Sequence, residues 1–465
     1  MASQSIDILD QSRPPAKTIW LLAWPTVMEQ LLQTMTGYVD TAMVGSLGAG
    51  ATAAVAINTS LTWLINGLMN AATLGFSIQV ARHVGNGNLE LSRRIVRQGM
   101  LVLLAGGLGL TLIFQLLAGS LPVILGAEPE VVPHAINYLR ILSSVHLFNL
   151  SMVMCGGFLR SAGDTRTPLQ INILANLANV CGNYFLIFSP RNVRILGKEF
   201  YVWGAGLGVE GAAAATAFSI FLAGCLLFWV LFQKKGVLGL SIRGDYRKDN
   251  AILKTAFDLG LPVALERVSN SSGQLVLTRL VAGLGTVPLA TYYLCNTLES
   301  ISYLPGFGFA IAATTLVGQS LGAGEKELAK TYGQKCITYC TIMMAIAGFS
   351  LFLFAKPLIS LFTPDVQVIA LGIIGLRIMA FAQPFSGLGI VISGILRAGG
   401  DTKSPFLIML SGMWLVRMTL VIILSYPLGL GIYGAWIAMI ADIIYRGLIS
   451  YRLYRKEQWL YLWNI

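Results

Sequence analysis

Only 11% of the 465 residues are charged and 55% are hydrophobic, whereas a soluble domain carries about 25% charged residues. This composition excludes a soluble globular protein and indicates a protein of the lipid bilayer. The formal net charge of +11 raises nucleic acid as a partner, but the basic residues are spread over separate connections, so we expect no nucleic-acid binding.

Apolar stretches long enough to cross a bilayer follow one another along the chain. A spanning helix needs about 20 residues, and stretches of that length predict about twelve helices, roughly six in each half. We expect them near residues 17–43, 52–81, 95–120, 135–158, 168–189, 206–232, 254–283, 289–317, 332–355, 368–394, 405–427 and 431–454.

The second half of the chain repeats the first. Pro25 corresponds to Pro262 (262 − 25 = 237), and the segment 160–168 corresponds to 397–405 at the same offset. A period this long fits a duplicated membrane half. The 14 extra residues of the first half fall in 190–204, after which the offset is 223. They predict a small hairpin outside the membrane, with a gate or binding lip as the alternative.

Lysine and arginine residues are concentrated in alternate connections, which places the even-numbered connections and both termini in the cytoplasm. The first, third and eleventh connections have none. An even number of crossings per half makes the halves parallel repeats about an axis near the membrane normal. We therefore expect an all-α integral membrane protein of two parallel six-helix bundles, located in the plasma (inner) membrane. The basic connections contain Arg82, Arg93, Arg94, Arg97, Lys234, Lys235, Arg243, Arg247, Lys248, Lys254, Lys326, Lys330 and Lys335.

Five segments follow from these elements. Residues 1–16 lack the basic start of a signal peptide, so we expect a cytoplasmic tail and a first helix that is a permanent span. The others are an N-lobe at 17–232, a cytoplasmic loop at 233–253, a C-lobe at 254–454 and a cytoplasmic tail at 455–465.

Features present in only one half are the better candidates for function, because the shared architecture does not require them. Asp40 lies late in the first predicted helix, and its counterpart is Leu277. A carboxylate at membrane depth is costly unless it faces a cavity, a partner or an ion. Asp40 is therefore a candidate for binding H⁺ or Na⁺, with a structural hydrogen bond as the alternative.

Two polar stripes run along the first and seventh predicted helices. Their members are spaced 3 or 4 residues apart, which puts them on one helix face. A polar helix face is unfavourable in contact with lipid, so we expect both stripes to line a central substrate cleft. The first stripe is Glu29, Gln33, Thr36 and Asp40, and the second is Glu266, Asn270, Gly273 and Leu277, with Ser269 and Gln274 beside it. Tyr38 is an aromatic candidate for lining the same cleft, where it would suit apolar and cationic ligands.

A third polar face belongs to the fifth predicted helix. Asn172, Asn176, Asn179 and Asn183 are again spaced 4, 3 and 4, while their counterparts in the second half are apolar. Amides in a membrane helix need partners. Together with Asp40 and Thr216 this face predicts a hydrophilic chamber for one cation, in which Asp40, Asn179 and Asn183 are the candidate ligands for Na⁺.

Other acidic residues have weaker functional signals. Glu29 and Glu266 occur in both halves, so structural and functional roles are equally open for them. Glu299 occurs once and is a further cleft candidate, although it can instead pair with Arg267 or Arg377. The repeated Asp164 and Asp401 precede predicted helices, where a carboxylate accepts from exposed amides, and we expect them to be structural.

Enzyme signatures are absent or out of context. Gly318-Gln-Ser-Leu-Gly322 matches a nucleophile elbow, but all three histidines lie upstream and the segment ends an apolar helix. No zinc-protease or P-loop pattern occurs. We expect no enzyme activity and no cofactor beyond a coupling ion.

Three segments resemble the MATE (multidrug and toxic compound extrusion) family. They are residues 32–45, which contain Asp40, and the paired turns at 156–164 and 393–401, within a similarity that covers 17–454. The resemblance implies a V-shaped pair of six-helix lobes that exports organic cations or amphipathic compounds in exchange for Na⁺ or H⁺. It also implies that Asp40, Asn179, Asn183 and Thr216 surround the coupling cation.

The chain departs from the family at three positions. Asn183 stands where archaeal members have a second carboxylate, Asn270 where many members have a glutamate, and Ser386 where such members have an acid on helix ten. We therefore expect coupling mainly through the N-lobe.

The function expected is multidrug antiport driven by H⁺ or Na⁺. Its partners would be drug-like small molecules and membrane lipids, with no obligate protein partner. A flippase of lipid-linked oligosaccharides is the alternative, although it would favour a strongly basic cleft. A membrane receptor or enzyme is a remote one.

Overall fold

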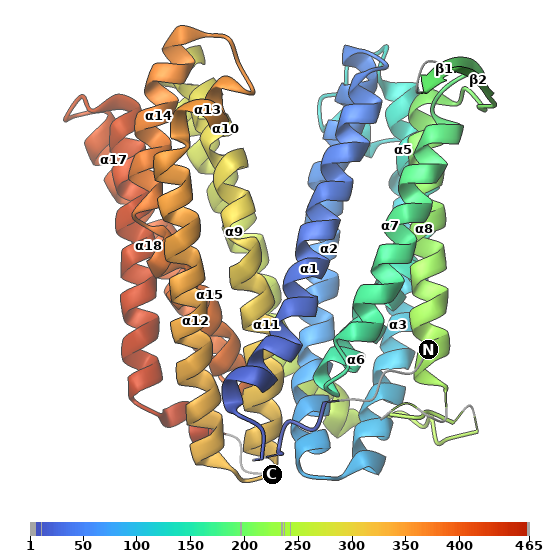
Figure 1. Cartoon of the computed structure of the whole chain (residues 1–465), viewed down its shortest axis with the longest axis vertical. Coiled ribbons are helices and arrows are strands. Elements are labelled where there is room, and N and C mark those ends of the chain that lie inside the picture. Colours follow the sequence, from blue (N-terminus) through green and yellow to red (C-terminus); the bar gives the residue numbers. More distant parts are fainter. Residues whose placement is uncertain are drawn as a thin grey trace. The chain divides into compact units, whose positions relative to one another are not determined.

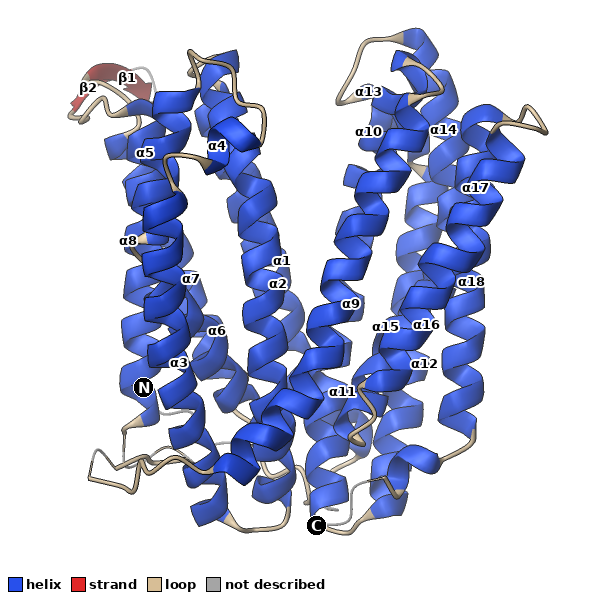
Figure 2. Cartoon of the chain, turned by 180° about the vertical axis from the view of Figure 1, so that it is seen from behind, coloured by secondary structure: helices blue, strands red, loops and turns tan. Residues whose placement is uncertain are grey.

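The structure is a computed structural model that describes residues 6–10, 12–195, 198–233, 236, 238–241 and 243–462. The described chain is helical apart from one pair of strands and the connecting segments (Figures 1 and 2). Its internal contacts define two compact units. The first unit contains Leu31–Val80 and Leu89–Lys254, and the second contains Ile6–Gln30, Ala81–Asn88 and Thr255–Ile465.

Three helices are divided between the units, and α9 (Asn250–Ala282) has only its first five residues, up to Lys254, in the first unit. Helix α1 (Pro15–Gly45) changes unit after Gln30, and α2 (Ala49–Gly85) changes after Val80. The remaining elements up to residue 231 belong to the first unit. They are α3 (Leu89–Leu117), α4 (Leu121–Ile124), α5 (Val132–Ser143), α6 (His146–Ser161), α7 (Arg166–Leu186), β1 (Arg191–Ile195), β2 (Lys198–Val202) and α8 (Gly208–Leu231).

The second unit contains almost all of α9 and every later element. These are α9 (Asn250–Ala282), α10 (Thr286–Ser302), α11 (Leu304–Gly322), α12 (Lys326–Leu353), α13 (Ala355–Ser360), α14 (Val366–Ala380), α15 (Gln383–Ala398), α16 (Lys403–Leu410), the π-helix η1 (Ser411–Arg417), α17 (Met418–Ser425), α18 (Gly431–Arg455) and the 3₁₀ turn η2 (Gln458–Leu460).

Many of these helices have the length and composition of membrane spans. Within the described residues, seven helices meet this test, or up to nine if each of two bent helix pairs is one span. The expected number of twelve spans and the five-segment division stay predictions. The seven are α2, α3, α8, α11, α12, the continuous stretch Lys403–Ser425 and α18.

Four of the expected spans contain a break that the apolar pattern does not predict. The pairs α5–α6 and α14–α15 each bend by 48°, α10 and α11 meet at Tyr303, and η1 interrupts Lys403–Ser425. Pro305 and Pro384 lie in the first turns of α11 and α15. Since proline has no N–H to continue a preceding helix, these residues explain two of the breaks.

The repeated aspartates start helices, as expected. Asp164 Oδ1 accepts from the Thr167 amide at 3.0 Å, ahead of α7. Asp401 Oδ1 accepts from the Ser404 amide at 2.9 Å, ahead of α16. Each carboxylate satisfies an amide that the first helical turn leaves free. Their structural role is confirmed.

The extra residues of the first half form the expected small hairpin. Strands β1 and β2 pair antiparallel, from Arg191 opposite Val202 to Ile195 opposite Lys198. The Arg191 guanidinium lies 4.5 Å from the Tyr184 ring centre and 4.1 Å from the Phe188 ring centre, which attaches the start of the hairpin to the end of α7.

The connection between the halves is bound to α3. The Gln98 side chain donates to the Arg247 carbonyl at 2.7 Å and accepts from the Asp249 amide at 3.0 Å. Asp249 then accepts from the Ala251 amide at the start of α9. Lys234 and Lys235 of the predicted basic connection lie outside the described residues.

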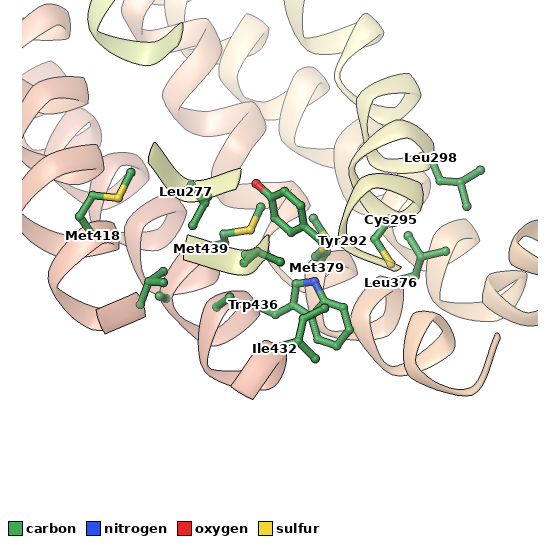
Figure 3. Close-up of a cluster of buried hydrophobic side chains, with 14 of the residues drawn as sticks. Leu277, Tyr292, Cys295, Leu298, Leu376, Met379, Met418, Ile432, Trp436 and Met439 are labelled. Carbon is green, nitrogen blue, oxygen red and sulfur yellow. The ribbon is translucent and has the colours of Figure 1, made fainter. Parts of the chain in front are cut away.

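The apolar core of the second unit is large and contains the repeat counterpart of Asp40. Leu277 of α9 is fully buried among Tyr292 and Cys295 of α10 and Trp436 and Met439 of α18 (Figure 3). The same position is therefore core in one half of the repeat and carries an acid in the other.

Two glycines allow α2 and α11 to cross closely inside the second unit. A Cβ on Gly85 would overlap the Gln319 carbonyl oxygen, and a Cβ on Gly322 would overlap the Arg82 carbonyl oxygen. Gly85 and Gly322 are repeat counterparts, as are Arg82 and Gln319. The same backbone contact is thus made twice, and it tolerates no side chain at either glycine.

We predict that Gly322→Ala destabilises the protein. The methyl group meets backbone that cannot rotate away, and such overpacking costs about 1–3 kcal/mol. Thermal unfolding in detergent should show a lower midpoint than for the natural protein. Gly109→Ala on α3 is the matched control, because its Cβ would meet nothing within 4 Å. Equal midpoints for the two variants would contradict the close crossing.

Candidate functional site

Asp40 lies in the first unit, on the part of α1 that follows the change of unit. Its Oδ1 accepts a hydrogen bond of 2.5 Å from Asn183 Nδ2 on α7. Asn183 is fully buried and Asp40 is half-buried. The acid therefore has an uncharged partner, with no arginine or lysine neutralising it among the described ion pairs.

The contact continues as a chain of amides and a hydroxyl. Asn183 Nδ2 also lies 3.2 Å from Asn179 Oδ1, one turn earlier on α7. Asn179 Nδ2 donates to Thr216 Oγ1 on α8 at 3.1 Å. The structure thus brings Asp40, Asn183, Asn179 and Thr216 into one hydrogen-bonded network, which we call the N-side network.

Small residues let α7 and α8 approach closely enough for this chain. A Cβ on Gly182 would lie 3.0 Å from the Cβ of Ala215, so the helices touch beside the Asn179–Thr216 bond. The asparagine spacing of 4 and 3 then places successive amides on one face of α7. Sequence spacing and close packing together explain why the four polar groups meet.

The network has unused hydrogen-bonding capacity. Asn183 Oδ1 is buried and has no hydrogen-bond partner among the described residues, and the same holds for Nδ2 of Asn176, which lies on α7 outside the network. Buried polar atoms are normally paired. A small cation needs oxygen ligands that are not already hydrogen-bonded, and Asn183 Oδ1 is such an oxygen, on the residue that contacts Asp40.

The second unit has no polar equivalent of the N-side network. The repeat counterparts of Asp40, Asn179, Asn183 and Thr216 are Leu277, Val416, Leu420 and Met439. Leu277 and Met439 belong to the buried core (Figure 3). Leu420 packs against this core. The symmetry of the repeat is therefore broken at all four positions.

The remaining predicted residues of α1 do not join the network by any described hydrogen bond. Glu29 is buried in the second unit, whereas Asp40 is in the first. Gln33 and Tyr38 are exposed, and Thr36 donates to the Leu32 carbonyl of its own helix at 2.9 Å.

The predicted residues of α9 make separate contacts. Glu266 forms an ion pair of 2.6 Å with Arg397 on α15. Gln274 Oε1 accepts from the Tyr292 hydroxyl at 3.3 Å, and Asn270 is half-buried. The ion pair gives Glu266 a fixed positive partner, which Asp40 does not have.

Glu299 is buried inside the second unit, where its Oε1 accepts from the Tyr303 hydroxyl at 2.5 Å and from Gln383 Nε2 at 3.0 Å. The alternative that it pairs with Arg267 or Arg377 is wrong. Arg377 is exposed and lies over the Phe352 ring, and Arg267 interacts with Glu266 and Arg397.

Sequence reasoning missed three charged residues near Glu299. Arg417 and Arg446 interact electrostatically with it, and both bind Asp442. Each of the three is a charged residue within an apolar predicted helix. That signal was available, because charges at membrane depth are costly and mark sites of function.

The described residues contain no group of three or more His, Cys, Asp or Glu side chains that could hold a metal ion. Any cation bound at Asp40 would therefore rely on amide and hydroxyl oxygens. A cavity of about 480 Å³ lies elsewhere, lined by Leu407, Ile408, Leu410, Ser411, Trp414, Leu415 and Ile449. It includes none of the predicted site residues.

Comparison with known proteins covers almost the whole chain. The MatE family model matches residues 25–185 and 262–423. A "Probable multidrug resistance protein NorM" of Thermotoga maritima is 29% identical over 446 residues, covering 95% of this chain and 93% of that protein. A protein of the same name from Shewanella oneidensis is 27% identical over 449 residues, covering 94% of each.

A solved structure shares the fold. The "Crystal structure of MATE in complex with MaD3S" gives a TM-score of 0.89, with 98% of each chain covered and 21% identity. The predicted all-α membrane fold built from a repeated half is confirmed. The family model also matches twice, once in each half of the repeat. On these grounds the chain belongs to the MATE family of multi-pass membrane transporters.

Proposed function

We propose that this protein is a multidrug efflux antiporter, and that its coupling cation, H⁺ or Na⁺, binds at Asp40. The observation that carries the proposal is the N-side network. It holds a carboxylate that has no described ion-pair partner and occurs in only one half of the repeat. The names of the similar proteins support drug-like substrates.

The physical basis is the cost of a charge at membrane depth. An ionised Asp40 is stabilised by the Asn183 amide but not neutralised by it. Binding of one small cation removes the net charge and changes which hydrogen bonds the network prefers. The network is thus a two-state element whose balance depends on the cation.

The donor set is compatible with either ion. A proton needs only a free carboxylate oxygen on Asp40. Na⁺ needs several oxygen ligands, for which the network offers Asp40, Asn179 Oδ1, Thr216 Oγ1 and the unpaired Asn183 Oδ1. An ion gradient imposed across a vesicle membrane distinguishes the two.

Antiport requires opposite preferences of cation and drug. The cation must favour one state of the transporter and the drug the other, so that binding of either lowers the affinity for the other. We expect the drug to bind from the cytoplasm and to be released outward when the cation binds.

The remaining parts of the proposal follow the charge pattern. We place the protein in the plasma (inner) membrane with both termini in the cytoplasm, with lipids as neighbours and no obligate protein partner. A flippase of lipid-linked oligosaccharides would need basic groups for its pyrophosphate, and the N-side network has none. A receptor or enzyme has no supporting feature in the described residues.

The first functional prediction concerns Asp40→Asn. This variant keeps the size of the side chain and loses the ionisable group, so gradient-driven efflux of a cationic dye such as ethidium should fall at least about tenfold, because the cation can no longer change the state of the network. The measurement is dye transport in proteoliposomes under an imposed pH or Na⁺ gradient.

Glu266→Gln is the matched control, since it makes the same chemical change in an acid that has a fixed partner, Arg397. Breaking this largely buried ion pair should lower the unfolding midpoint, because it leaves Arg397 uncompensated, but transport per folded protein should remain within about twofold of the natural protein. Undiminished gradient-driven efflux in Asp40→Asn would contradict the assignment of the coupling site.

A second prediction tests the amide partner. Asn183→Leu removes the amide that donates to Asp40 at 2.5 Å. The carboxylate then lacks this hydrogen bond, which should lower the free energy of unfolding by about 1–3 kcal/mol. We expect less gradient-driven efflux and a lower unfolding midpoint. Asn176→Leu is the control on the same helix, because the side-chain nitrogen of Asn176 makes no hydrogen bond to any of the described residues. Similar losses of efflux and of the unfolding midpoint in both variants would argue against a specific role for Asn183.

A further inference from the structure

The second unit contains an ion cluster that the coupling mechanism does not use. Asp442 on α18 is fully buried. Its Oδ2 lies 2.7 Å from Arg417 Nη2 at the end of η1 and 2.8 Å from Arg446 Nη2, one turn further along α18. One carboxylate oxygen thus binds two guanidinium groups, of which Arg417 is buried and Arg446 half-buried.

Glu299 supplies the second negative charge. It is 2% exposed, and it interacts electrostatically with both Arg417 and Arg446. Its hydrogen bonds from Tyr303 and Gln383 orient the carboxylate, and the Ser302 hydroxyl in turn donates to Gln383 Oε1 at 2.7 Å. We call Glu299, Arg417, Asp442 and Arg446 the C-side cluster.

The charges of the C-side cluster balance only when both acids are ionised. Two arginines and Asp442 carry a net charge of +1, and an ionised Glu299 brings the total to zero. An excess charge inside a membrane protein is costly, and a broken buried pair leaves its partner uncompensated. The arginines therefore favour the ionised form of Glu299.

Three departures from regular helix meet at this cluster. Tyr303 separates α10 from α11, Gln383 begins α15 after a 48° bend, and Arg417 ends η1. Gly412 within η1 leaves room for Asp442, because a Cβ there would overlap Asp442 Oδ1. The charged groups therefore lie where the backbone is irregular, which is where a fixed set of contacts is needed to hold one geometry.

The first half of the repeat has no such cluster. The counterparts of Glu299, Arg417, Asp442 and Arg446 are Thr62, Val180, Ser219 and Ala223. The bend at Gln383 is repeated, since its counterpart His146 begins α6 after another 48° bend. The bend is thus common to both halves, whereas the charges occur only in the second.

We propose that the C-side cluster is a set of ionic contacts and hydrogen bonds with zero net charge, and that it holds the interrupted helices of the second unit in one geometry. Glu299 is its counter-ion and a positioning residue, and it does not bind the coupling cation. Within the described residues, Tyr292, Cys295 and Tyr303 also interact electrostatically with Glu299. All three are neutral when protonated, so the arginines and Asp442 set the charge balance.

The test is a charge-compensation experiment. Glu299→Gln leaves an excess of +1 and should lower the midpoint of thermal unfolding in detergent by about 5 °C or more. Glu299→Gln combined with Arg446→Gln returns the cluster to neutrality and should recover at least about half of that loss. Glu327→Gln is the control, because Glu327 is an exposed acid on α12.

A transport measurement adds a readout that stability alone does not give, and this part rests on the proposed function. The double variant should export dye with the same dependence on the H⁺ or Na⁺ gradient as the natural protein. Three results would overturn the proposal: a stable Glu299→Gln single variant, a double variant no more stable than the single one, or a stable double variant with altered cation dependence. The stability readout needs no transport, so it holds whether or not Asp40 couples to a cation.

Discussion

The cost of placing a charged side chain at membrane depth is the constraint on which the rest of this structure depends. Hydrocarbon offers no water to a carboxylate, so each buried acid needs polar contacts or a counter-charge. The two halves of the repeat share their helical framework but meet this constraint differently. The N-side network gives its acid only neutral partners, whereas the C-side cluster gives its acids arginines.

This difference has a functional consequence. An acid with amide and hydroxyl partners keeps a net charge that a small cation can remove, so its state responds to cation concentration. An acid balanced by arginine has little to gain from a cation, because binding would leave the arginine uncompensated. Asp40 bonded to Asn183 is of the first kind, and Glu266 bonded to Arg397 is of the second. The proposal that a cation couples through only one half of the duplicated protein rests on this difference.

Much of the fold follows from periodicity and local chemistry. Apolar stretches located the long helices, the 237-residue offset related the halves, and Asp164 and Asp401 began helices because a carboxylate satisfies free amides. The N-side network was predictable because the asparagine spacing puts its members on one face of α7 and an acid in lipid requires partners.

Other features depend on contacts between distant segments and could not be read from such patterns. Arg417, Asp442 and Arg446 each stand within an apolar stretch. The i,i+4 spacing on α18 predicts the Asp442–Arg446 pair, but only the packing of η1 against α18 brings Arg417 to Asp442. The change of unit within α2 has no local signal, since α2 is one continuous helix, whereas in α1 Pro25 lies shortly before the change at Gln30. The bend between α5 and α6 lacks a proline at the break, and we have no physical account of it.

The most direct test of the central claim measures cation release when a drug binds to the purified protein in detergent. Competition between the two ligands at the N-side network predicts that ethidium displaces a cation from the natural protein, detected as a proton released into weak buffer or as a loss of bound ²²Na⁺. Asp40→Asn should bind the dye without releasing any cation. Cation release from Asp40→Asn equal to that from the natural protein would contradict the account.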